Sequence, residues 1–209
     1  KVTLASLLIA LGIIYGDIGT SPLYVMKSII DDREISELLV YGGVSCVFWT
    51  LVFQTTFKYV TLTLMADNHG EGGIFSLYAL VRRFGKGLVF SAMVGASALL
   101  ADGMITPPIS VASAVEGLGK VAPHLPTVPI VIFILSFIFF FQRFGTQTVG
   151  FVFGPIMAVW FGMLLVLGMV QIFHYPGIVC ALNPKYAIEL LTLYPQGFWL
   201  LGAVFLCTT

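Results

Sequence analysis

Long apolar runs without a charged residue constrain this chain more than any other feature. No Asp, Glu, Lys or Arg occurs in residues 38–57, 121–142 or 144–184. About 20 apolar residues suffice for a helix to cross the hydrocarbon core of a bilayer, so these runs predict three membrane spans, the last over 149–173. Because only 10% of the 209 residues are charged and 58% are hydrophobic, a water-soluble globular domain is excluded.

Two further spans carry polar interruptions. Residues 88–118 are equally apolar but contain Asp102 near the middle and Glu116 near the end. Residues 2–30 are interrupted at 16–22 by glycines, Asp17 and Pro22, which no continuous lipid-facing helix would contain. We therefore predict five transmembrane helices in residues 1–174, with the first broken at 16–22 into two half-helices.

The remaining segments are connections. Residues 66–86 combine a glycine-rich loop with apolar residues at helical spacing, which predicts a loop and an amphipathic helix at the membrane surface. Residues 175–197 form a connection, and 198–209 begin a sixth helix that is too short to cross as given. With a cytoplasmic amino terminus, six of the ten Lys and Arg residues lie inside, which predicts a multi-pass plasma-membrane protein with 66–86 cytoplasmic and 175–197 extracellular.

The two acids within the spans, Asp17 and Asp102, are the candidate functional groups. An aspartate at the centre of a membrane helix costs about 2.5 to 3.5 kcal/mol on insertion scales, so it indicates a function. A break beside Asp17 frees carbonyls and amides, and such groups are tolerated in a membrane only where they line a cavity. The sequence therefore predicts a polar chamber at the break.

A row of oxygen ligands is expected on the third span. Asp102, Thr106 and Ser110 are spaced by four residues, which places them on one helix face, and Pro107 and Pro108 leave nearby carbonyls without a donor. Oxygen ligands favour hard cations of the alkali or alkaline-earth type. An aspartate in such a chamber also accepts a proton when no cation is present, which makes Asp17 and Asp102 the candidates for proton coupling.

Three ordered motifs resemble those of the KUP/HAK/KT potassium uptake permeases. They are residues 16–24 (GDIGTSPLY), 66–73 (ADNHGEGG) and 105–110 (ITPPIS) with Glu116 and Gly117. The resemblance covers essentially the whole chain and implies an all-α LeuT-like bundle of the amino acid-polyamine-organocation superfamily, of which this chain is the first five-helix inverted repeat plus the start of helix 6.

The resemblance also implies the activity, which is secondary active potassium uptake by proton symport. By motif match, the potassium ligands would be Asp17, Tyr24, Asp102, Thr106 and Ser110. The implied partners are potassium, the lipid bilayer and the second inverted repeat of a longer polypeptide, with no cofactor, no enzymatic activity and no nucleic acid, and a homodimer is left open. Many bacterial relatives have glutamate at position 102, which leaves the roles of the two acids open.

Three alternatives remain open at this point. An amino-acid permease of the same superfamily would bind a carboxylate at the half-helix amides, where Asp17 would repel it. A non-transporting potassium sensor would need the same ion site. An intramembrane aspartyl protease also uses two membrane carboxylates, but its motifs do not match in register.

Overall fold

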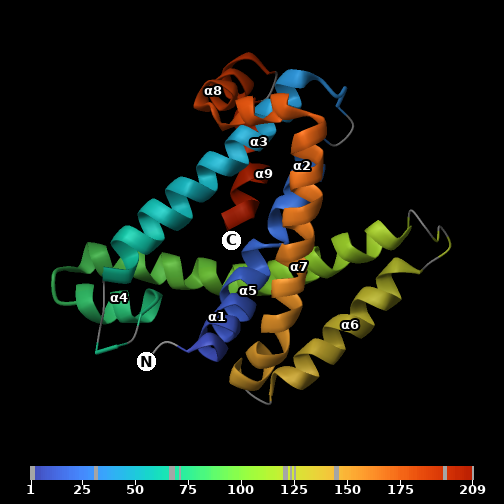
Figure 1. The fold of residues 1–209 in the computed structure, drawn as a ribbon. Coiled ribbons are helices and arrows are strands. Elements are labelled where there is room, and N and C mark those ends of the chain that lie inside the picture. The colour runs from blue at the N-terminus through green and yellow to red at the C-terminus, as the bar shows by residue number, and fades with distance from the viewer. Residues whose placement is uncertain are drawn as a thin grey trace.

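The computed structural model describes residues 3–30, 33–65, 69–70, 72–119, 122, 124, 126–143, 146–194 and 197–208. Every regular element in these ranges is a helix (Figure 1). Three continuous helical stretches are long and apolar enough to cross a membrane, namely Glu37–Met65, Lys86–Gly119 and Val152–His174. Shorter apolar helices lie at Leu4–Gly16, Thr127–Phe141 and Gly197–Thr208. The predicted class, an all-α multi-pass membrane protein, is confirmed.

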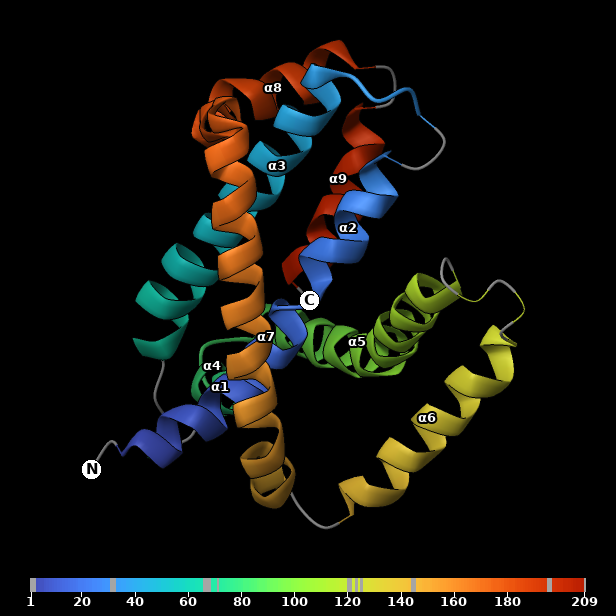
Figure 2. The same ribbon diagram turned by 45° about the vertical axis from the view of Figure 1, so that its right-hand side comes forward.

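The first predicted span consists of two helices, α1 (Leu4–Ile18) and α2 (Ser21–Ile30). Helix α1 lies against α7 (Thr146–His174), as both ribbon views show (Figures 1 and 2). At their crossing, a Cβ added to Gly12 would lie 2.5 Å from the backbone nitrogen of Gly154. The two backbones are therefore in contact, as is typical where small residues line a helix interface within a membrane.

Helix α3 (Glu37–Leu51) is capped by Ser36, whose hydroxyl accepts a hydrogen bond from the Leu39 N–H at 3.2 Å. The helix continues as a π-helix, η1 (Val52–Leu62), and a 3₁₀ turn, η2 (Thr63–Met65). We expected this span to end at Phe57, before Lys58, but Lys58 is exposed on η1. The charge therefore does not end the helix, because an exposed side chain does not place its ammonium group in an apolar interior.

The packed core lies where α2 and α3 meet the last two helices of the chain. The connection contains a 3₁₀ helix, η3 (Pro176–Leu182), and α8 (Pro184–Leu193), and is followed by α9 (Gly197–Phe205) and η4 (Leu206–Thr208). Figure 2 shows α8 across the end of α3, and α9 beside α2. The fully buried side chains that join these helices include Val25, Ile29, Leu39, Leu190, Val204 and Cys207.

Helix α5 (Lys86–Gly119) runs through Pro107 and Pro108 as one element and contacts α6 (Thr127–Gln142) and α4 (Ile74–Val81). Helix α4 lies within the segment 66–86 that was expected to contain an amphipathic helix, and it ends at Val81 rather than continuing at helical spacing to Phe84. Gly85 has a φ of 151°, which other residues rarely adopt, so the chain turns there before α5 begins.

Candidate functional site

The break between α1 and α2 is a short turn at Gly19 and Thr20. The Gly19 N–H donates to the Tyr15 carbonyl at 2.8 Å, and the Thr20 hydroxyl donates to the Gly16 carbonyl at 3.3 Å. The indole N–H of Trp160, on α7, donates to the Gly19 carbonyl at 3.2 Å. We expected the break to leave carbonyls free, but these three oxygens already accept hydrogen bonds within the chain. Sequence reasoning missed Trp160, because no local pattern signals its contact with Gly19.

The two predicted ligands from the first span differ in what the structure describes. Asp17 belongs to the last turn of α1, and its side chain lies outside the described residues. Tyr24, in α2, is 9% exposed, and its hydroxyl donates to the Ser21 hydroxyl oxygen at 2.9 Å. Ser21 is fully buried. Tyr24 therefore places a hydroxyl group inside the protein, one helical turn from the break.

The three predicted ligands on α5 share a half-buried face. Asp102, Thr106 and Ser110 are each partly buried, whereas Gly103, Met104 and the other residues between Asp102 and Thr106 are exposed. The Thr106 hydroxyl donates to Oδ1 of Asp102 at 2.8 Å, which leaves its oxygen lone pairs and the second carboxylate oxygen available. The spacing by four residues thus brings these two side chains together.

The Ser110 hydroxyl oxygen is buried, and no described atom hydrogen-bonds to it. A buried polar atom normally has a partner, so a partner outside the described residues or a bound ligand is indicated. Ser110 is followed along α5 by Glu116, whose carboxylate contacts Lys27 on α2. Ile109, the residue before Ser110, packs against the core cluster that contains Tyr24. Ser110 and Tyr24 therefore lie on adjoining helices, while Asp102 and Thr106 lie further along α5.

A cavity of about 500 Å³ opens beside the carboxyl end of α1. Its walls come from α1, η1 and η2, with Thr208 from η4. The polar lining residues include Tyr15, Gln54, Thr55, Lys58, Thr63 and Thr208. Tyr24, Asp102, Thr106 and Ser110 do not line this cavity. From the sequence, Lys58 was interpreted as the residue after a charge-free run and as one of the six basic residues on the cytoplasmic side, not as part of a cavity wall.

The family whose model matches this chain is described as the K⁺ potassium transporter integral membrane domain, and the match covers residues 4–209. Curated relatives align over the entire chain. One from Cytophaga hutchinsonii is 61% identical, and one from Flavobacterium psychrophilum is 60% identical. A third, from Clostridium perfringens, is 52% identical. Each is named "Probable potassium transport system protein Kup".

The chain spans 33%, 32% and 34% of the length of these three relatives, respectively. No solved structure matches the chain.

Proposed function

The chain belongs to the K⁺ potassium transporter family, in agreement with its motifs, and we propose that the longer protein containing it is a secondary active potassium uptake system. The relatives are named for transport and not for catalysis, in agreement with the expectation that the chain is not an enzyme. The transported ions would be potassium and a proton, carried inward together across the plasma membrane. No cofactor enters this proposal.

The observation that carries the proposal is the polar row on α5. The Asp102 carboxylate accepts a hydrogen bond from the Thr106 hydroxyl at 2.8 Å, and the buried Ser110 hydroxyl oxygen, one turn later, has no described partner. These groups form a set of oxygen ligands in an apolar helix. Such ligands suit a hard cation. Asp17 and Tyr24 from the broken first span would complete the ligand set, and potassium would bind where the two spans face each other.

The proposal of proton coupling rests on the position of Asp17 and Asp102 within apolar helices. In the absence of a cation, desolvation favours the neutral form of a membrane carboxyl group. Symport requires both ions to be bound in the state that moves inward, so potassium and the proton would occupy different acids. We propose that one of Asp17 and Asp102 pairs with potassium as a carboxylate while the other carries the proton.

Alternating access requires a second set of helices that moves against this one. We propose that this chain is the first inverted repeat of a LeuT-like bundle, with α9 as the start of its sixth helix, and that the second repeat lies in the rest of a longer polypeptide. The amino terminus would be cytoplasmic, so η3 and α8 would lie outside the cell. The bilayer would cover the exposed apolar faces, and a homodimer is compatible with this arrangement.

The proposal is tested by producing the full-length protein in cells that lack potassium uptake and measuring entry of a rubidium tracer. Wild type should restore growth on limiting potassium, and Asp17→Asn should lower uptake at least about thirtyfold, because loss of a buried charged partner costs about 2 kcal/mol or more. Glu189→Gln, in α8, is the control and should match wild type. Equal uptake by Asp17→Asn and wild type would exclude the proposed ion site.

The same cells distinguish the alternatives. A sensor would bind potassium without rubidium entry, and an amino-acid permease would take up labelled amino acid instead. An intramembrane protease would cleave a peptide substrate in a manner that depends on both aspartates. Stimulation of rubidium entry by an acidic outer medium would support proton symport.

A further inference from the structure

Lys27 and Glu116 form an ion pair between α2 and α5. The Lys27 Nζ lies 2.5 Å from Oε2 of Glu116, although the residues are 89 positions apart in the sequence. Their side chains are 68% and 51% exposed. The pair therefore joins the two helices that carry Tyr24 and the α5 row, and it does so at a place open to its surroundings.

The position of the pair follows from the path of the chain. Lys27 precedes the end of α2 at Ile30, and Glu116 precedes the end of α5 at Gly119. The first and third spans end on the same side of the membrane, because one full crossing back separates them. Lys27 is one turn beyond Tyr24, and Glu116 lies beyond Ser110. The pair thus lies between the proposed cation ligands and one membrane face, which we expect to be the outer face.

We propose that Lys27 and Glu116 are positioning residues for the transport cycle, which hold α2 against α5 while the outer mouth of the cation path is closed. This inference rests on the proposed function. An exposed ion pair is weak and separates readily, which suits a contact that opens once in each cycle. Ile109, which packs on the core around Tyr24, holds the helices together at the level of the ligands when the pair opens.

Removing either charge weakens the closed state relative to the open one. A binding-competent state that is more populated raises the apparent affinity in proportion. Given the weakness of exposed pairs, Lys27→Gln and Glu116→Gln should each lower the KM for external rubidium about two- to fivefold. The maximal rate should fall as well, because closure around the ion becomes less favourable. A role in folding alone would lower the amount of active protein without this change in KM.

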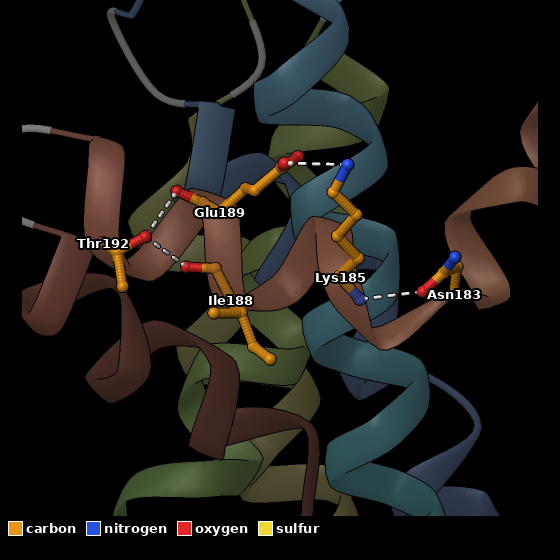
Figure 3. Close-up of polar contacts among 5 residues, drawn as sticks. All are labelled: Asn183, Lys185, Ile188, Glu189 and Thr192. Carbon is orange, nitrogen blue, oxygen red and sulfur yellow. Dashed lines mark hydrogen bonds and ion pairs between the residues drawn. The ribbon is translucent and has the colours of Figure 1, made fainter.

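The test is rubidium uptake by the full-length protein, with the quantity in the membrane measured for each variant. The exchanged pair, Lys27→Glu with Glu116→Lys, should return KM and maximal rate toward wild type. The matched control is the pair between Lys185 and Glu189 at 3.4 Å, which lies within α8 and joins no two spans (Figure 3). Exchanging those two charges should leave the KM unchanged.

A second measurement covers variants that fold poorly. The double variant Lys27→Cys with Glu116→Cys, joined by a short cleavable thiol reagent, should lose rubidium uptake and regain it when the link is cut. Each single cysteine variant controls for the native Cys46, Cys180 and Cys207. An unchanged KM in both glutamine variants, no recovery in the exchanged pair, or full uptake by the linked protein would overturn the proposal. Absence of uptake by wild type would instead overturn the proposed function.

Discussion

The spans built on α3 and α5 use the rest of the chain in different ways. In the most apolar 18-residue window, 33% of the α3 span is buried against other parts of the chain, against 6% for α5. Helix α3 is held by α8, η3 and α9, whereas α5 exposes large apolar side chains such as Leu100 and Met104. Along α5, Ala92 and Val115 are buried, and the polar row of Asp102, Thr106 and Ser110 is half-buried. Under the proposed function, α3 organises packing and α5 supplies ion ligands.

A surrounding bilayer explains how α5 can be stable with few contacts to other helices of this chain. Apolar side chains on α5 lose nothing when they face hydrocarbon, because acyl chains are as apolar as leucine. The backbone hydrogen bonds of a helix are internal to it, so they need no partner from another helix. Helix α5 can therefore persist with few contacts inside this chain, and its polar residues should matter for transport more than for stability.

The largest expected effect is at Asp102, where a substitution should change transport but not stability. Asp102→Asn in the full-length protein should lower rubidium uptake at least about thirtyfold, because a neutral amide cannot balance the charge of a desolvated cation. The melting temperature of the purified protein should stay close to that of wild type. Asp102→Glu keeps the charge and should retain part of the uptake. Unimpaired uptake by Asp102→Asn, or a large loss of stability, would reverse the assignment of chemistry to α5.

A pair of glycine substitutions tests packing directly. A Cβ at Gly42, on α3, would lie 2.6 Å from the Cβ of Leu190 and 3.0 Å from the Tyr186 carbonyl oxygen, whereas at Gly103, on α5, it would meet nothing within 4 Å. Gly42→Ala should therefore lower the free energy of unfolding by about 1 to 3 kcal/mol, the usual effect of overpacking. Gly103→Ala should leave it unchanged or raise it slightly, since alanine favours helix. Thermal melting of the full-length protein measures both.

The two glycine substitutions can also contradict the difference in packing between α3 and α5. If Gly103→Ala destabilises the full-length protein as much as Gly42→Ala does, then a segment outside this chain packs closely on α5. The contrast would then belong to this part of the protein only.

The features predictable from the sequence are those set by neighbours along the chain. Apolar runs mark the long helices, the motif at residues 16–24 contains the turn between α1 and α2, and the spacing of Asp102 and Thr106 brings their oxygens together. The hydropathy pattern does not distinguish an α-helix, with hydrogen bonds between residues four positions apart, from a π-helix, with hydrogen bonds between residues five positions apart. The change from α-helix to π-helix at Val52 therefore left no signal in the sequence pattern.

The remaining features depend on contacts between distant residues. Trp160 and Gly19 are 141 positions apart, and Ser45 and Asn183 are 138 apart. Neither pair belongs to a repeating pattern. The sequence predicts residues 175–197 only as a connection. Helix α8 packs on α3 and α9, and the sequence of the connection does not show that these two helices provide a surface for it.

The smallest expected effect compares two serine hydroxyls. Ser45, fully buried on α3, donates to the Asn183 carbonyl at the start of α8 at 3.1 Å. Ser97, exposed on α5, donates to the Met93 carbonyl of its own helix at 2.9 Å. Ser45→Ala leaves the Asn183 carbonyl, in a partly buried hydrogen bond, with one donor fewer, so it should lower the free energy of unfolding by about 1 kcal/mol.

Ser97→Ala removes a bond that stays within one helix, so the change should be below about 0.5 kcal/mol. Equal effects in thermal melting would show that the tie between α3 and α8 contributes no more than a local bond. A larger effect at Ser45 would mean that the connection stabilises α3 through this contact, since no tie to another segment is lost at Ser97.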